Sequence, residues 1–345
     1  SDYYTLDTYD WKSIGVNGNY PGTYIRAKNE RLPSFDSTDP DLKPVAQSEF
    51  SFGVEQKLRE NLSASVRFVY KHLISALEDI GFEEPQGTEY YTGNPGFGWT
   101  RYQKDGGRWP NELWACPKAK REYYAVNASV DKRFSDRWMA GLSFTWSSLR
   151  GNYSGLASSD EVDVNGYGRT DPNVARFWDG WFLPYTQDGK PIDGPLATDR
   201  PLYFKAYGSY NFPFGLTIGT VANAYSGVPT SIEVAMGGMQ GFYPLGRGTE
   251  ERSPFVYYVN LFAEYPIRMG RFHVTLSLNI DNLTNNDVAQ RIYPLYNQDD
   301  PALTQAEILN AFDYRAIVQD LDPRFLKEYL FMKPISARVG VKIGF

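Results

Sequence analysis

The chain has 345 residues, of which 42% are hydrophobic, 22% are charged and 16% are aromatic, and its formal net charge is −6. No stretch approaches the roughly 18 uncharged apolar residues of a transmembrane helix, which rules out a helical membrane bundle. The acidic balance gives no electrostatic reason to expect a nucleic-acid partner. The single cysteine, Cys116, excludes an internal disulfide and a multi-cysteine metal site.

Two-residue alternation of apolar and polar side chains predicts β-strands that occur in pairs. In chain order, the predicted hairpins join residues 45–58 to 62–76, 121–134 to 138–146, 201–212 to 216–224, and 254–267 to 271–281. One further strand is predicted at residues 335–345. The last two strands have about ten residues each, the length that a tilted strand needs to cross a bilayer.

These last two strands also predict which side chains meet lipid. We expect the apolar set to face lipid, namely Val274, Leu276, Leu278, Val339 and Val341. The alternating polar set is expected to face the lumen, namely Thr275, Ser277, Arg338 and Lys342. Charged residues that alternate with apolar ones, such as Arg67, Asp131 and Glu264, favour a wide, watery or plugged lumen.

The connections between hairpins differ sharply from the turns within them. The turns have about three residues, whereas the connections fall near residues 81–118, 151–197, 228–252 and 286–330. Short turns on one rim and long loops on the other are typical of an outer-membrane barrel, with the turns in the periplasm and the loops outside the cell. Aromatic residues at the strand ends suit belts at both membrane interfaces, although aromatics also favour strands in general. The predicted fold class is an all-β, antiparallel transmembrane barrel portion.

Two segments resemble a known family. Asp39-Pro40-Asp41-Leu42-Lys43-Pro44, followed by Glu49-Phe50-Ser51-Phe52-Gly53-Val54-Glu55-Gln56-Lys57-Leu58, is similar to a passage in the barrels of TonB-dependent receptors, in the branch with carboxypeptidase-regulatory-like N-terminal domains. Asp281-Asn282-Leu283-Thr284-Asn285 resembles the penultimate-strand motif of these receptors. The final strand, which ends in Phe345, resembles the terminal signal read by the barrel-assembly machinery.

The predicted strand count indicates part of a larger barrel. Nine strands are predicted, whereas plugged outer-membrane transporters have about 22. We therefore expect residues 45–345 to be the C-terminal part of a barrel that cannot close alone, and residues 1–44 to form an extracellular loop with the end of a preceding strand. The expected partners are outer-membrane lipid, an N-terminal barrel half and a plug, which lie in a missing region or a separate chain.

The resemblance implies a receptor in the outer membrane of a Gram-negative bacterium that imports a bulky nutrient through a plugged barrel. Its plug would couple it to the TonB system, and the barrel-assembly machinery would insert it. Two other interpretations stay open: a passive porin-like or adhesive barrel, and a soluble secreted carbohydrate-binding β-protein. No residue set indicates an enzyme or a cofactor. No metal site is indicated either, because the acidic clusters near Asp160 and Asp299 lack the spacing of a calcium loop.

Two of the long loops are rich in aromatic residues with interleaved polar ones. Stacking and hydrogen bonding to a sugar or peptide need such groups. The candidate substrate-binding residues are Trp99, Tyr102, Trp109, Trp114, Trp178 and Trp181. The alternative is that the loops fold over each other and bury these side chains as a small loop core.

Overall fold

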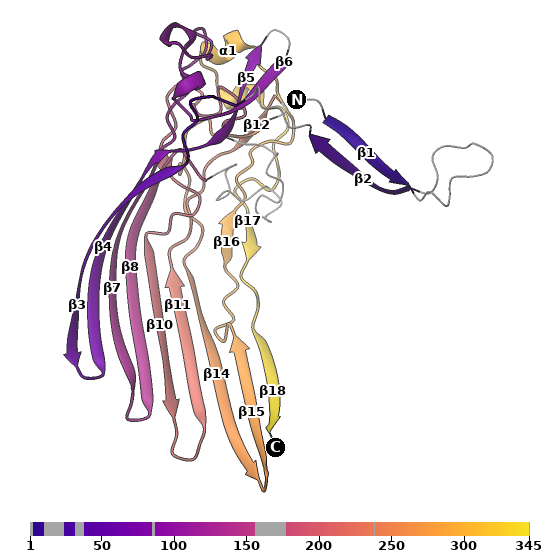
Figure 1. Ribbon diagram of the computed structural model, residues 1–345. Helices are drawn as coiled ribbons and strands as arrows, with labels where there is room; N and C mark the ends of the chain where they lie inside the picture. Colours follow the sequence, from indigo (N-terminus) through magenta and orange to yellow (C-terminus); the bar gives the residue numbers. More distant parts are fainter. Residues whose placement is uncertain are drawn as a thin grey trace.

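The computed structural model describes residues 3–9, 24–31, 38–84, 87–155, 177–237 and 239–344. Its main feature is one antiparallel sheet in which nine long strands follow the order β18-β15-β14-β11-β10-β8-β7-β4-β3 (Figure 1). These strands are β3 (Ala46–Arg59), β4 (Leu62–Ser75), β7 (Arg121–Ser135), β8 (Trp138–Gly151), β10 (Leu202–Asn211), β11 (Thr217–Tyr225), β14 (Val256–Met269), β15 (Phe272–Asp281) and β18 (Ser336–Gly344). All nine strands predicted from the alternation are confirmed.

Shorter elements lie outside this path. The short β9 (Gly194–Pro195) pairs with β8. Two-stranded sheets are formed by β1 (Tyr3–Tyr9) with β2 (Tyr24–Arg31), β5 (Glu78–Glu84) with β6 (Gly87–Gly93), β12 (Val234–Met236) with β13 (Met239–Phe242), and β16 (Ala289–Ile292) with β17 (Glu328–Phe331). The helices are α1 (Gln305–Leu309) and α2 (Tyr314–Ile317), with 3-10 turns at Gly98–Thr100 and Gln103–Asp105. Within the described ranges, no helix has the length and apolar character needed to span a membrane.

The two ends of the sheet differ as the sequence predicted. Short turns join β3 to β4, β7 to β8, β10 to β11 and β14 to β15 at one end, and the long loops gather at the other (Figure 1). In the β7–β8 turn, Asp136 and Arg137 have φ angles of 51° and 72°. Positive φ at both central residues is the geometry whose twist matches a two-residue hairpin.

The sheet has one apolar face and one polar face. Phe52, Val54 and Val339 are exposed on the apolar face, with 64%, 61% and 78% of their surfaces accessible. On the other face, Thr145 Oγ1 donates to Asn127 Oδ1 at 2.7 Å. A continuous face of large exposed apolar side chains marks a contact surface, and in a barrel wall this is the face that meets lipid.

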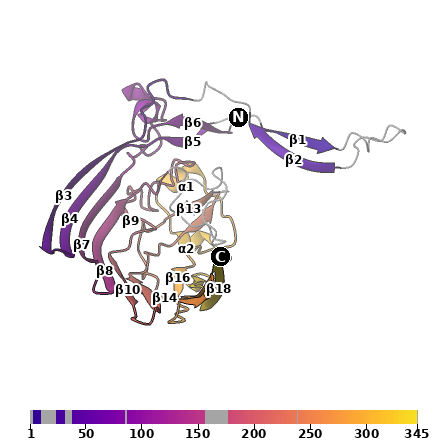
Figure 2. The same cartoon turned by 60° about the horizontal axis from the view of Figure 1, so that its bottom comes forward.

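The nine-stranded path is open. Within the described residues, β3 pairs only with β4 and β18 pairs only with β15, so each edge leaves backbone groups without a strand partner. The sheet curves as a barrel wall does but does not close (Figure 2). In lipid such an edge costs several kcal/mol for each unsatisfied group, which makes this sheet a portion of a larger barrel.

Asn282 stabilises the exit from β15. Its φ of 52° reverses the chain, and its side chain is only 5% exposed. Its Nδ2 donates to the carbonyl oxygens of Asn286 at 2.9 Å and Lys333 at 2.8 Å, and its Oδ1 accepts from Asn286 N at 3.1 Å and from Thr284 Oγ1 at 3.0 Å. The segment that resembles the penultimate-strand motif therefore links the end of β15 to the residues that lead into β18.

Candidate functional site

The four long loops share one hydrophobic core above the sheet. Each loop contributes buried side chains: Ile80 and Trp109 from the first, Trp181 and Leu183 from the second, Val234 and Phe242 from the third, and Ile308 and Tyr314 from the fourth. Backbone bonds also cross between loops, as from Gly81 N to Trp178 O at 3.0 Å. We call this cluster the loop core. It converts four separate connections into one packed layer at the extracellular end of the strands.

The structure brings all six candidate substrate-binding residues together in the loop core. Trp109, Trp178 and Trp181 are buried, with exposed fractions of 2%, 3% and 1%. Trp99, Tyr102 and Trp114 are partly buried and pack against them. Their placement matches the packed-loop alternative, and a binding role for them stays a prediction.

Specific contacts hold these side chains. Trp109 Nε1 donates to Trp114 O at 2.6 Å. The ring of Trp114 lies edge-on to that of Trp181, with centroids 5.4 Å apart. Such edge-to-face pairs stabilise beyond their buried area. The two Trp-rich loops are therefore joined to each other through Trp114.

The outer part of the cluster carries cations over aromatic rings. The guanidinium of Arg108 lies 3.6 Å from the ring centroid of Trp99, and Lys104 Nζ lies 4.9 Å from that of Tyr102. Burial, followed by the charge of Asp105, raises the pKa of Tyr102. The Tyr102 hydroxyl stays protonated and donates to Leu113 O at 3.1 Å.

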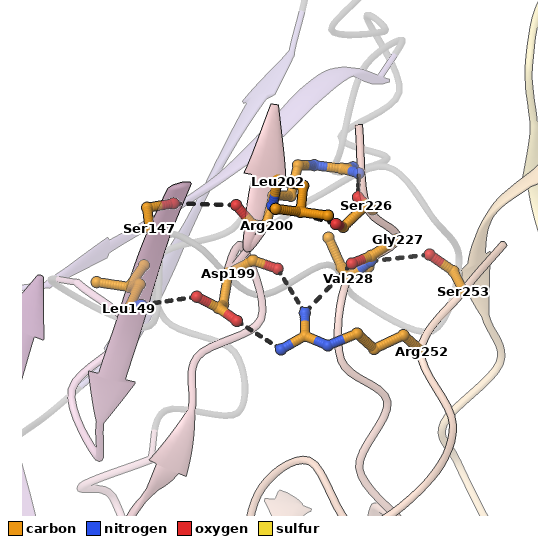
Figure 3. A network of polar contacts seen from close by, with 10 residues as sticks. All are labelled: Ser147, Leu149, Asp199, Arg200, Leu202, Ser226, Gly227, Val228, Arg252 and Ser253. Atoms are coloured by element: carbon orange, nitrogen blue, oxygen red, sulfur yellow. Dashed lines mark hydrogen bonds and ion pairs between the residues drawn. The ribbon is translucent and has the colours of Figure 1, made fainter. Parts of the chain in front are cut away.

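A cluster of polar side chains lies where the loops join the strands. Asp199, 3% exposed, accepts from Arg252 Nη2 at 2.5 Å and from Leu149 N at 2.6 Å. Arg252 Nη1 also donates to the carbonyl oxygens of Asp199 at 2.9 Å and Gly227 at 3.2 Å (Figure 3). We call this set the rim network. It fixes the start of β10 against β8 and against the loops that follow β11 and precede β14.

Sequence reasoning missed the rim network. Asp199 and Arg252 are separated by 53 residues, and neither lies in a motif. The only sequence feature that could have indicated this pair is position, because both residues lie directly before predicted strands, where loops must be anchored. A local pattern cannot pair them.

The other groups that the sequence raised are Cys116, the acidic clusters and Phe345. Cys116 is buried, and burial raises the pKa of its thiol to about 12, so it stays an unreactive thiol. No group of three or more His, Cys, Asp and Glu side chains in the described ranges is placed to hold a metal ion. Phe345 and the acidic cluster that begins at Asp160 lie outside the described residues.

Comparisons with known proteins point to one class. The sequence pattern of the outer membrane beta barrel domain matches residues 13–228. The TonB-dependent transporter Oar of Myxococcus xanthus is 26% identical over 336 residues, which cover 89% of this chain and 29% of the transporter. The chain thus spans less than a third of the length of this curated relative.

Solved structures of similar shape include transporters and receptors. The outer membrane transporter YddB from Escherichia coli matches 88% of this chain and 33% of its own, with a TM-score of 0.47 and 14% identity. FpvA of P. aeruginosa, solved with bound pyoverdines, matches 75% of this chain and 26% of its own, with a TM-score of 0.41 and 15% identity.

Proposed function

Because the chain belongs to the outer membrane beta barrel domain family and lies in the outer membrane of a Gram-negative bacterium, we propose that it is the C-terminal part of a TonB-dependent transport receptor. In this proposal the receptor takes a bulky nutrient at its extracellular loops. It then passes the nutrient through a plugged barrel with energy supplied from the inner membrane.

One observation carries the proposal: a nine-stranded barrel portion with both edges open is topped by a packed loop core. A small passive barrel of eight or so strands closes on itself. An open wall of this size instead requires further strands, and large plugged barrels provide them. The 26% identity with a TonB-dependent transporter over 89% of this chain supports the same conclusion.

The missing partners follow from the open edges. We infer that an N-terminal barrel half pairs with both β3 and β18, and that a plug fills the lumen and contacts the TonB system. Residues 1–44 would connect to that half as an extracellular loop with the end of a preceding strand. The barrel-assembly machinery would read the C-terminal segment that holds β18 and, in the sequence, Phe345.

Uptake that depends on the proton gradient tests the proposal. Cells with and without the full-length receptor are grown on a complex medium, and the loss of each compound from the medium is followed by mass spectrometry. We expect one bulky compound to be depleted only by cells with the receptor, and the depletion to stop when a protonophore is added. Depletion that continues with the protonophore would indicate a passive porin and contradict the proposal. Binding at the cell surface without depletion would indicate an adhesive barrel.

A further inference from the structure

Arg200 lies at the mouth of the lumen, directly before β10. The alternation of side chains along β10 shows which face its neighbours lie on. Leu202 and Phe204 are exposed on the lipid face, so Tyr203 between them points to the lumen side. Tyr203 pairs in register with Tyr225 of β11, and their rings stack with centroids 5.2 Å apart and planes 7° apart. The guanidinium of Arg200 lies 4.5 Å from the ring centroid of Tyr225. Arg200 therefore belongs to the lumen side of the wall.

The backbone of Arg200 is held on both sides. Ser147 Oγ of β8 donates to Arg200 O at 3.0 Å, and Ser147 N donates to Pro201 O at 2.9 Å. On the other side Leu202 N donates to Ser226 Oγ at 3.1 Å (Figure 3). The adjacent Asp199 is fixed by Arg252. A side chain on such a fixed segment loses little freedom when it binds a ligand.

The guanidinium itself is only partly used. Its Nη1 donates to Ser226 O at 2.7 Å, and its Nε and Nη2 have no acceptor among the residues that the structure describes. Nε and Nη2 form one edge with two parallel N–H groups. This edge matches the two oxygens of a carboxylate. Arg200 thus keeps a complete bidentate edge that no described residue uses, beside the ring of Tyr225.

The electrostatic surroundings favour an anion there. Burial is the largest cause that lowers the pKa of Arg200, the Tyr225 hydroxyl opposes it, and the charges of Arg291 and Arg252 lower the pKa further. The carboxylate of Asp199, the nearest acid in the rim network, is already bonded to Arg252. The guanidinium stays protonated, and a neighbouring anion would therefore meet its positive charge.

We propose that Arg200 binds a carboxylate group of the ligand as the ligand leaves the loops and enters the lumen, through two hydrogen bonds from Nε and Nη2, beside a wall formed by Tyr225 and Tyr203. The direction of passage rests on the proposed transport function, but the binding site does not. The ligand class is a compound with an exposed carboxylate.

Benzoate and its neutral analogue benzamide serve as probes, measured by saturation-transfer NMR on the purified full receptor in lipid nanodiscs. We expect benzoate to bind about tenfold more tightly than benzamide, the range of a charged hydrogen-bond pair. Arg200→Gln should reduce benzoate binding to the benzamide level. Arg200→Lys keeps the charge without the fork and should recover only part of the difference. Lys205→Gln, which removes one positive charge from the lumen face of the same strand, should leave benzoate binding unchanged.

Three results would overturn the inference: equal binding of benzoate and benzamide by the unaltered receptor, full benzoate binding by Arg200→Gln, or an equal loss in Lys205→Gln. In a competition experiment, acetate should displace benzoate better than inorganic phosphate does. Equal displacement by the two anions would contradict the carboxylate class. If Arg200→Gln does not fold, Arg200→Lys decides the test, because full benzoate binding by this variant would contradict the two-bond contact from Nε and Nη2. No proton gradient is present, so these results are independent of whether the receptor transports.

Discussion

Replacement of Asn282 should release the segment that joins β15 to β18. The buried side chain makes four hydrogen bonds, two from Nδ2 and two to Oδ1. Each lost bond costs about 1 kcal/mol, and shared partners reduce the sum to about 2–4 kcal/mol. Asn282→Ala also places a Cβ-bearing residue other than Asn at a φ of 52°, which adds about 1 kcal/mol. Asn282→Gly loses the hydrogen bonds but tolerates this φ, so the difference between the two variants isolates the backbone cost.

Hydrogen exchange followed by mass spectrometry measures this effect on the full receptor. A local loss of about 3 kcal/mol corresponds to roughly a hundredfold faster exchange through local opening. We expect this for peptides that cover residues 282–286 and 332–336, with a smaller effect in Asn282→Gly. Leu283→Ala is the matched control, because Leu283 is 43% exposed and its removal should change little. Unchanged exchange in Asn282→Ala, or equal acceleration in Leu283→Ala, would refute the assigned role.

Three further predictions concern the two faces, the loop core and pH. Leu276→Arg should destabilise the barrel by about 2–4 kcal/mol and Ser277→Arg by much less, as measured by guanidinium unfolding in lipid vesicles, and equal losses would contradict the predicted faces. Trp181→Ala removes a side chain that is 1% exposed and should destabilise the loop core by about 3–5 kcal/mol, seen as faster proteolysis of the loops. Unaltered ligand uptake by Trp109→Ala and Trp181→Ala would exclude the predicted binding role of these residues. A hydrogen bond from Arg324 is the largest cause that lowers the pKa of Asp322, so the stabilisation by Asp322 is complete above the unfolded-state pKa and is lost as pH falls through the lower folded-state pKa. Loop proteolysis should therefore accelerate below about pH 4 in the unaltered receptor, and Asp322→Asn should remove much of that pH dependence.

The strands were predictable because their pattern is local. In a wall between lipid and lumen, each residue's environment depends on its parity along the strand, so a segment such as Phe272–Asp281 reveals its structure without any knowledge of its neighbours. The turns were equally local, as with Asp136 and Arg137. Strand boundaries consequently agree with the predicted ranges to within a few residues, except that β8 runs on to Gly151.

The loops and the site were less predictable because their contacts are distant in sequence. Phe312 N bonds to Gln187 O, and Tyr314 N bonds to Gln187 Oε1, across about a third of the chain. An aromatic residue in a long loop looks the same in sequence whether it binds a ligand or packs against another loop. For Trp109 and Trp181 only the fold reveals the burial. Arg200 needed the same information, since its position on the lumen side follows from the register of Tyr203 and Tyr225.

The loop core also has a mechanical consequence for the loops. Its four loops join β4 to β7, β8 to β10, β11 to β14 and β15 to β18, so every long strand except β3 ends in the same packed layer. A force applied to one loop is therefore shared, through the loop core, with the strands that the other loops join. The four loops therefore behave as one packed layer, and none of them can swing aside without breaking contacts in the loop core.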